Sequence, residues 1–426
     1  MRITKWAWGL GLATAALMTA CGGGGSGSTA HMRLMNASIG YASLDMAVDS
    51  TTVNSGVTYA GVGTYADVNT GATGTEVQSN SVGSTLASTT PSLTAGSHYT
   101  MIAYGAAGTV RTTLLQEDQE VPAAGKSKLL ILNLAPDAGA LDVYVTGTSE
   151  TLDSASTSAA AIAAGSGSGY LTFNSGTVRV RLTASGSKSD LRLDIPSIAL
   201  PDAGVSTLVL TGSSGGVLVN GIQVIQQGAT TNFPNSTARA RLVAAVGGNA
   251  LVAGSIGSTQ LLPTSTAPTI GDYQTIATGA TAPTIFVNGA QLQVPSFPTL
   301  AAGGDYTLMV WGPAGSPQLT VLTDDNKLPT TSTAAKIRLV NGVANASAGL
   351  TLNVDYSALA SNVLAGTSST PTTTAATTSS LLTVNSPASA TPVYSLSSLA
   401  IQANGVYTVF VMGDSTSMVG SLRKER

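Results

Sequence analysis

The sequence predicts an all-β protein made of tandem immunoglobulin-like β-sandwich domains. One strand-like phrase returns along the chain, as AGSHYTMIAYG from Ala95, AGGDYTLMVWG from Ala302 and ANGVYTVFVMG from Ala403. Short alternating segments rich in branched and aromatic residues, such as LDVYV at 141–145, are separated by clusters of Gly, Pro, Asn and Ser. No long segment carries a helical apolar stripe, so units of about 100 residues with frequent turns indicate sandwiches.

The composition is typical of a folded extracytoplasmic protein. Of 426 residues, 43% are hydrophobic and only 9% are charged, which disfavours disorder and supports a packed core. The net charge is −3 and no basic stripe exists, so the sequence predicts no nucleic-acid partner. The one dense basic run, RKER at 423–426, is interpreted as a solvated tail.

The first twenty residues predict a signal peptide at 1–20. Arg2 and Lys5 precede an apolar stretch, Trp6–Leu17, that is too short to span a bilayer. The following LMTAC resembles a bacterial lipobox, which implies cleavage before Cys21 and lipidation of its thiol. An ordinary secretory leader with a chance cysteine is the alternative. Since Cys21 is the only cysteine, the sequence predicts no internal disulfide.

Residues 21–31 are predicted to be the lipidated cysteine and a flexible Gly/Ser tether. The membrane is therefore a partner through the N-terminal lipid anchor. Gly22, at the position after the cysteine, favours the outer membrane, so we expect a cell-envelope protein that is lipid-anchored there. Both a periplasmic and a surface-facing placement stay open.

A second recurring phrase opens each of four units. Its versions are RLMN at 33–36, LILN at 130–133, RLVA at 241–244 and RLVN at 338–341. The fourth residues of these phrases are 97, 111 and 97 positions apart, which identifies homologous repeats. The predicted sandwich repeats are 32–122, 123–234, 235–332 and 333–426.

The tyrosine of the longer phrase has a predicted structural role. Tyr99, Tyr306 and Tyr407 each follow a turn and enter a strand. A tyrosine in that position often buries its ring and bonds its hydroxyl to a nearby backbone group. In unit 3, Tyr306, Leu308 and Val310 alternate and should share one face.

The junction sequences resemble a known family. LLQEDQEVPAAGKSKLLILNLAPDAGALDVYVTG at 114–147, and VLTDDNKLP at 321–329, are similar to the bacterial domain-of-unknown-function family 4397. Such domains occur in secreted and envelope proteins, commonly as tandem repeats. Unit 3 departs from the pattern, with Ala244 in place of the Asn. The resemblance implies an extracytoplasmic β-domain, and it transfers no activity and no catalytic residue.

The sequence offers little that could do chemistry. The only two histidines are His31, at the edge of the tether, and His98, interpreted as a surface residue at a strand entry. GSSGG at 212–216 matches a nucleophile-elbow pattern, but a strand-like segment follows it, so a hairpin turn is predicted. Two distant histidines and one acylated cysteine form no zinc motif. The sequence therefore predicts no catalytic residue, no metal site and no cofactor.

Some features leave alternatives open. The acidic pairs Glu117–Asp118 and Asp324–Asp325 are interpreted as linker carboxylates, with calcium ligation as the alternative. Trp311 is the only tryptophan after the leader, which gives weak support for sugar stacking. Residues 154–165 could form a turn or two of helix. The low-complexity stretch 368–380 is predicted to be an exposed loop that could carry glycans.

These observations predict a non-enzymatic, lipid-anchored envelope protein that displays tandem sandwiches for binding or structural roles. Its partner would be an envelope protein or a glycan. A surface adhesin or polysaccharide-binding protein is one alternative, and an envelope hydrolase with an unrecognised site is another.

Overall fold

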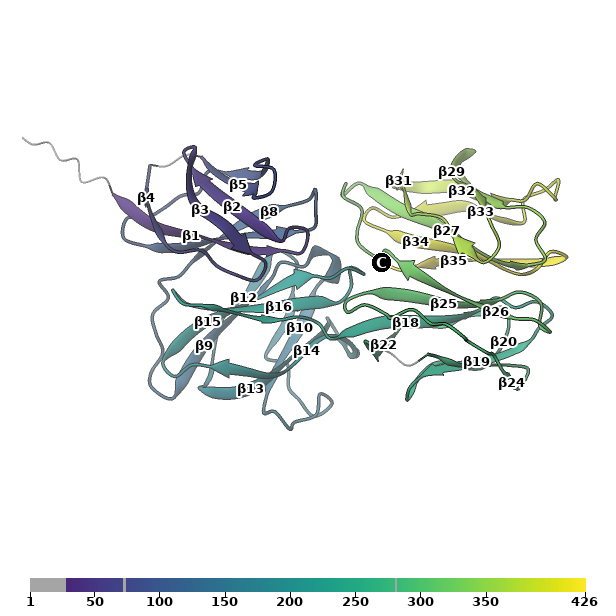
Figure 1. Cartoon of the computed structure of the whole chain (residues 1–426), viewed down its shortest axis with the longest axis horizontal. Coiled ribbons are helices and arrows are strands. Elements are labelled where there is room, and N and C mark those ends of the chain that lie inside the picture. The colour runs from purple at the N-terminus through teal and green to yellow at the C-terminus, as the bar shows by residue number, and fades with distance from the viewer. Residues whose placement is uncertain (1–27, 72–73, 280–281) are drawn as a thin grey trace, which may run out of the picture.

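The protein folds into four β-sandwich units, each made of two facing sheets (Figure 1). The computed structural model describes residues 28–71, 74–279 and 282–426. Cys21 and the leader lie outside these residues. Among the described residues there is no α-helix, and one short 3₁₀ segment, η1, spans Pro136–Ala138. No helix in this part of the chain has the length and apolar character that a membrane span requires.

In each unit we call the sheet that holds the opening strand and the repeated-phrase strand the inner sheet, and the other the outer sheet. The inner sheet of unit 1 has the order β4 (Ala66–Asn69), β1 (Thr29–Ser38), β7 (His98–Gly105), β8 (Arg111–Gln116). Its outer sheet has the order β3 (Thr51–Thr58), β2 (Ser43–Val48), β5 (Thr75–Ser79), β6 (Thr85–Thr89). The inner sheet of unit 2 has the order β12 (Ser166–Asn174), β9 (Lys126–Asn133), β15 (Gly204–Gly212), β16 (Val219–Ile225), β17 (Thr230–Phe233). Its outer sheet has the order β11 (Ala159–Ile162), β10 (Leu141–Thr146), β13 (Gly176–Ala184), β14 (Ser187–Leu200).

Units 3 and 4 repeat this plan, with the first edge strand split in two. In unit 3 the inner sheet places β21 (Thr269–Ile270) and β22 (Gln274–Ala277) on β18 (Thr237–Ala244), followed by β25 (Asp305–Trp311) and β26 (Gln318–Asp324). Its outer sheet has the order β20 (Thr259–Thr266), β19 (Leu251–Ile256), β23 (Thr284–Val287), β24 (Ala290–Gln291). In unit 4 the inner sheet places β30 (Thr367–Ser368) and β31 (Thr372–Ala375) on β27 (Ala334–Ala344), followed by β34 (Val406–Asp414) and β35 (Ser417–Lys424). Its outer sheet has the order β29 (Ser357–Val363), β28 (Leu350–Val354), β32 (Thr377–Asn385), β33 (Tyr394–Ile401).

The opening strand and the repeated-phrase strand run parallel in every unit, as β1 with β7, β9 with β15, β18 with β25 and β27 with β34. The other strand pairs are antiparallel. Parallel neighbours need a long crossover between them, and here the chain makes it by passing through the outer sheet. The sandwich fold class expected from the sequence is therefore confirmed.

The repeated-phrase strand is buried on both faces. In β25, Tyr306, Leu308 and Val310 enter the core of unit 3, as the alternation predicts. The intervening Met309 and Trp311 lie in a second hydrophobic cluster that unit 3 shares with unit 4. A strand sealed on both faces needs apolar residues at nearly every position, which accounts for the almost continuous YTLMVW run.

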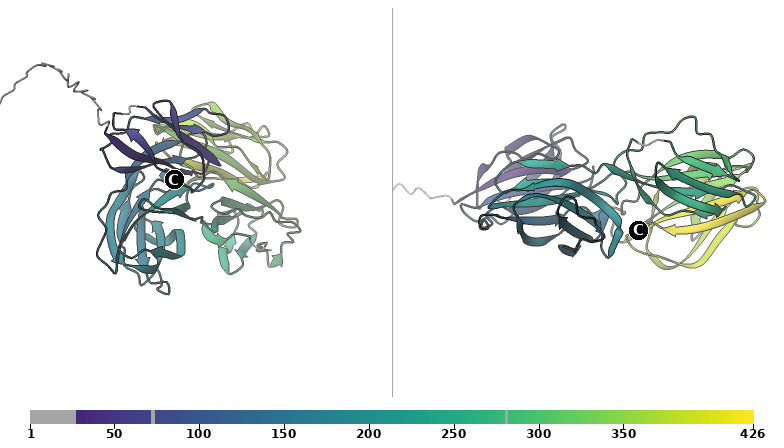
Figure 2. Two further views of the ribbon diagram at one scale, coloured as in Figure 1. Left: turned by 60° about the vertical axis from the view of Figure 1, so that its left-hand side comes forward. Right: turned by 90° about the horizontal axis from the view of Figure 1, so that it is seen from below.

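The units therefore associate in two pairs through their inner sheets (Figure 2). The cluster between units 1 and 2 contains Met35, Ala37, Ala60, Ile102, Leu115, Leu134, Val209, Ile222 and Val224. The cluster between units 3 and 4 contains Val243, Ala245, Ile270, Met309, Leu322, Val340, Phe410 and Met412. Burial of so much apolar surface drives the pairing of units.

The two pairs touch through the turn between β15 and β16. The GSSGG stretch forms this hairpin, as predicted, and Gly215 donates its N–H to the carbonyl of Gly303 at 2.8 Å. Gly215 allows the close approach, because a Cβ there would lie 2.7 Å from the backbone nitrogen of Asp305. Nearby, the N–H of Leu328 donates to Asp137 at 2.6 Å.

The predicted tyrosine contacts are confirmed in three units. The hydroxyl oxygens of Tyr99, Tyr306 and Tyr407 accept backbone N–H bonds from Thr94, Ala301 and Gln402 at 2.9 to 3.0 Å. All three rings are buried. In unit 2 the equivalent residue is Ser206, whose buried hydroxyl has no partner among the described residues.

The Asn of the opening phrase also has a structural role. Asn36, Asn133 and Asn341 are fully buried. Each side-chain oxygen accepts the backbone N–H of the residue two positions later. Each side-chain amide donates to a carbonyl in the edge strand of the outer sheet, such as that of Val363 for Asn341 at 2.9 Å. This residue thus ties the two sheets together, which explains its recurrence.

Four local expectations are wrong. Residues 29–31 are the first residues of β1 and pair with β4 instead of extending the tether. Within 154–165, β11 pairs with β10, because an available sheet edge overrides the helix preference of Ala. The stretch 368–380 contains β31 and parts of β30 and β32, since branched Thr suits strands. In RKER, Arg423 and Lys424 are exposed but belong to the end of β35, and the Glu425 side chain is only 6% exposed, so the run is not a solvated tail throughout.

We predict that Tyr306→Phe lowers the free energy of unfolding by about 1 kcal/mol, because the N–H of Ala301 loses its acceptor. Denaturant unfolding, with hydrogen exchange at the Ala301 amide, measures this. Tyr356→Phe is the matched control, since Tyr356 is 89% exposed. Equal effects of the two substitutions would contradict the assigned role.

Candidate functional site

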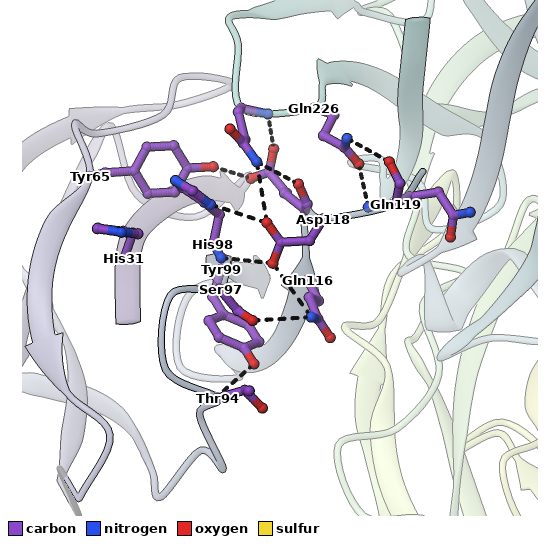
Figure 3. Close-up of polar contacts among 12 residues, drawn as sticks. His31, Tyr65, Thr94, Ser97, His98, Tyr99, Gln116, Asp118, Gln119 and Gln226 are labelled. Carbon is purple, nitrogen blue, oxygen red and sulfur yellow. Dashed lines mark hydrogen bonds and ion pairs between the residues drawn. The ribbon is translucent and has the colours of Figure 1, made fainter. Parts of the chain in front are cut away.

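The strongest candidate site is the place where the only two histidines of the chain meet (Figure 3). His31 in β1 and His98 in β7 are paired in register on neighbouring parallel strands. Their rings stack with centroids 4.5 Å apart and an interplanar angle of 27°. With Asp67 and Asp118 they form what we call the His–Asp cluster.

Each imidazole in the cluster contacts one carboxylate. Nδ1 of His31 lies 2.7 Å from Asp67, and Nδ1 of His98 lies 3.1 Å from Asp118. The ring of Tyr65 meets His98 edge to face at 5.1 Å. The side chains of the two histidines are 34% and 28% exposed, so the cluster is open to solvent.

Asp118 is held in its charged form. Partial burial acts to raise its pKa, but hydrogen bonds from the backbone N–H and the ring of His98, and from Gln116, outweigh burial and lower the pKa below its usual value. Gln227 of unit 2 adds a contact at 3.3 Å. The cluster therefore lies at the seam between units 1 and 2.

Beside the cluster lies a buried ion pair between Arg33 and Glu117. Two guanidinium nitrogens of Arg33 donate to Glu117 at 3.0 to 3.3 Å, and its Nε also donates to Thr100 at 2.9 Å. Both side chains are at most 5% exposed. A third Arg33 nitrogen donates to the carbonyl of Gly228 in unit 2 at 2.7 Å, so the pair also joins the units.

Tyr65 completes this network as a neutral donor. Its hydroxyl donates to Glu117 at 2.9 Å, and the Arg33 guanidinium lies 4.6 Å from its ring centroid. Burial and then the negative charge of Glu117 raise the pKa of Tyr65 well above its usual value. The backbone N–H of Gln227 also donates to Glu117, at 2.5 Å, which completes the shell around the carboxylate.

Units 3 and 4 hold a related network in which the ion pairs cross the interface. Arg241 of unit 3 donates to Glu425 of unit 4 at 2.7 Å. Arg338 of unit 4 donates to Asp324 of unit 3 at 2.6 Å. Tyr273, the counterpart of Tyr65, donates its hydroxyl to Asp324 at 2.5 Å. Burial, followed by the charge of Asp324, raises the pKa of Tyr273 well above its usual value.

Among the residues that the structure describes, no hydroxyl or thiol forms a hydrogen bond with the His98 ring. A base oriented by a carboxylate, as His98 is by Asp118, needs a hydroxyl or thiol within hydrogen-bond reach to activate it. Among the described residues, the side chain of His98 contacts His31, Tyr65 and Asp118. In this part of the chain, no three His, Cys, Asp or Glu side chains are placed to hold a metal ion.

The acidic junction pairs divide into one buried and one more exposed residue each. Glu117 and Asp324 serve as counter-ions of buried arginines, so a calcium ion would have to displace those arginines. Asp118 binds His98, and Asp325 pairs with Lys336 at 2.8 Å with its side chain 43% exposed. Cys21 lies outside the described residues, and its lipidation stays a prediction.

Sequence reasoning missed Arg33 and Tyr65 as partners of the acidic pair. An arginine inside an otherwise apolar phrase was one available signal, because a buried guanidinium needs a carboxylate. The recurrence of a tyrosine shortly after Gly63, Gly169 and Gly271 was another. Neither signal identifies the partner, since Arg33 and Glu117 are 84 residues apart.

Comparisons with known proteins place the chain in a family. Residues 30–144 and 238–348, together more than half of the chain, match the domain of unknown function DUF4397, and the chain belongs to this family. Each matched stretch covers most or all of the first unit of a pair and enters the second. No curated protein matches the chain significantly.

Two solved structures are distantly similar. A "putative cell adhesion protein" of Bacteroides uniformis has 13% identity and a TM-score of 0.22, and the match covers 48% of this chain and 98% of that one. A "putative cell adhesion protein" of Parabacteroides distasonis has 12% identity and a TM-score of 0.18, covering 71% and 99%. Scores this low give no information about function.

We predict that Glu117→Ala lowers the free energy of unfolding by about 3 to 5 kcal/mol, because it leaves the buried Arg33 charge unpaired. Asp325→Ala, which removes the exposed partner of Lys336, should cost less than about 1 kcal/mol. Denaturant unfolding of both variants measures the difference. A small cost for Glu117→Ala would refute the counter-ion role.

We predict that Asp118→Asn destabilises the protein in a pH-dependent way. A carboxyl whose pKa is lowered by folding stabilises above its unfolded pKa, near 4, and this contribution is lost as the pH falls through the lower folded value. The difference in stability between the parent protein and the variant should therefore be large at pH 7 and vanish under strongly acidic conditions. Unfolding curves from pH 7 to pH 2 measure it, and a constant difference would contradict the assignment.

Proposed function

We propose that this protein is a non-catalytic, lipid-anchored cell-envelope protein that displays four β-sandwich units for binding. The observation that supports this function best is that the buried charged side chains pair with one another at the interfaces between units. Arg33, Glu117, Arg241, Asp324 and Arg338 all pair inside the unit interfaces, where they hold sandwiches together. Arg241 also lines a cavity of about 200 Å³, but its guanidinium is already paired there with Glu425.

The paired arrangement suits a display role. Each pair buries its inner sheets, so the outer sheets and hairpin tips remain as the surfaces that a ligand could reach. Membership in the DUF4397 family is compatible with this role and assigns no activity. A lipid on Cys21 would hold such a platform at a membrane through the tether that follows.

The surface-adhesin alternative differs from an envelope role in the periplasm only in placement, because an adhesin must face the outside of the cell. Protease digestion of intact cells separates the two placements, because only a surface-facing protein is cleaved before the envelope is broken.

For the hydrolase alternative, activity screens of the purified protein would have to find turnover that one side-chain substitution abolishes without unfolding.

We predict that Cys21→Ala releases the protein from the membrane fraction and abolishes the incorporation of labelled palmitate. Cys21 is the only cysteine, so no other thiol can accept the lipid. Cys21→Ser is a second variant that keeps the size of the side chain and removes the thiol. Membrane attachment that survives both substitutions would rule out the anchor.

A further inference from the structure

We propose that the free edge of unit 4 is a binding site for a neutral polysaccharide chain, which rests on the binding role proposed above. The site is a groove of about 500 Å³ between the edge strand β29 of the outer sheet and the edge strand β30 of the inner sheet. In Figure 1, β29 lies on the side of unit 4 that faces away from unit 3. We call this groove, together with Tyr356 just before β29, the unit 4 edge.

The lining of the groove determines the charge of its ligand. None of the lining residues is charged, so an ionic polymer would find no counter-charge there. The polar groups in the lining include Ser361, Asn362, Thr367, Ser368 and Thr370. Hydroxyls and amides both donate and accept hydrogen bonds, which matches the hydroxyl groups of a sugar.

Several of these groups are available to a ligand. The side chains of Ser361, Asn362, Ser368 and Thr370 form no hydrogen bond with any described residue, whereas Thr367 donates to the carbonyl of Leu364 at 2.8 Å. Leu364 is 55% exposed and adds an apolar contact at the same groove. A sugar chain has both hydroxyl groups and apolar C–H faces, so it uses both kinds of surface.

The same edge is poorly suited to an extended peptide. Strand addition needs a regular row of free backbone groups. The pairing of β29 with β28 shifts register twice, and Asn362 within β29 has a φ of +54°. Pro371, just after the groove-lining segment, has no N–H to donate. Bulges and prolines of this kind protect an edge from further strands.

Tyr356 provides the second observation. It lies in the tight turn between β28 and β29, where Asp355 and Tyr356 have φ values of +47° and +67°. Glycine is the usual second residue of such a turn, and a bulky residue there is strained. The Tyr356 side chain is 89% exposed, so packing within the chain does not compensate for the strain. An exposed aromatic ring retained under strain is typical of a binding contact.

The turn that carries Tyr356 is held firmly. The Asp355 carboxylate accepts the backbone N–H of Leu381 and the hydroxyl of Ser380, both at 2.8 Å. A fixed ring loses little entropy on binding and can pack against the C–H face of a sugar. Tyr356 and Asn362 are separated by roughly 20 Å of strand, so a ligand that reaches both must be a polymer.

The test measures the binding of the full-length protein to dextran, amylose and galactomannan, with the acidic polymer alginate for comparison, by affinity electrophoresis and calorimetry. At least one neutral polymer should bind, and alginate should not. Tyr356→Gly should weaken binding about tenfold and raise the melting temperature, because it removes the strained side chain.

The matched control is Ser50→Gly, at the equivalent tight turn of unit 1, where Ser50 has a φ of +66°. This substitution should also raise the melting temperature while leaving binding unchanged. The double variant S361A/T370A should weaken binding from the groove side without unfolding the protein, since neither side chain bonds another described residue.

The proposal is overturned if none of the three neutral polymers binds, if alginate binds as well as they do, or if Tyr356→Gly and Ser50→Gly affect binding equally. Competition by an extended peptide at this groove would assign the edge to strand addition instead. The Cys21→Ala experiment measures membrane attachment alone, so a failed binding test leaves the anchoring result unaffected.

Discussion

The structure depends on burying each inner sheet twice, once in the core of its own unit and once against the inner sheet of a neighbour. A strand sealed in this way has no solvent to satisfy its polar groups, so every charge in the interface needs a partner. Arg33 and Glu117 meet that requirement within unit 1, and Arg241 and Glu425 meet it across the second interface. The apolar clusters drive association, and the ion pairs restrict it to one geometry.

The same positions differ between units in a physically consistent way. Unit 2 has Leu130 where units 1, 3 and 4 have arginine, and Gln226 at the position of Glu117. It has thus lost the cation and the anion together, which avoids an unpaired buried charge. Ser206, which replaces the tyrosine of the repeated phrase, is the exception, since its buried hydroxyl lacks a partner among the described residues.

The features that could be predicted from the sequence are those whose causes are local or repeated. Tyr99, Tyr306 and Tyr407 each bind a backbone group only five residues away, immediately before the repeated phrase, so both partners are local in the sequence. The four opening phrases likewise established the unit plan. The stacking of His31 on His98 follows from a strand register that no local pattern specifies. The arginine networks were unpredictable for the same reason, as Arg241 and Glu425 are 184 residues apart. Near the unit 4 edge, the Thr-rich segment forms a strand because it pairs with β27, which is distant in the sequence. Its composition alone suggested a loop.

The different ion pairs of the two interfaces have a consequence for how the chain assembles. Tandem domains of similar sequence can exchange partners during folding and become trapped in the wrong association. If the inner sheet of unit 2 docked on unit 3, Arg241 would face Leu130 and Gln226 instead of Arg338 and Glu425, and its charge would be buried without a carboxylate from the partner unit. Asp324 of its own unit, 4.0 Å from Arg241, would remain as a counter-ion, so the wrong pairing would lose the two ion pairs that cross the native interface without leaving Arg241 unpaired. The crossing ion pairs therefore favour unit 4 over unit 2 as the partner of unit 3, through attraction in the correct association and not through repulsion in the wrong one.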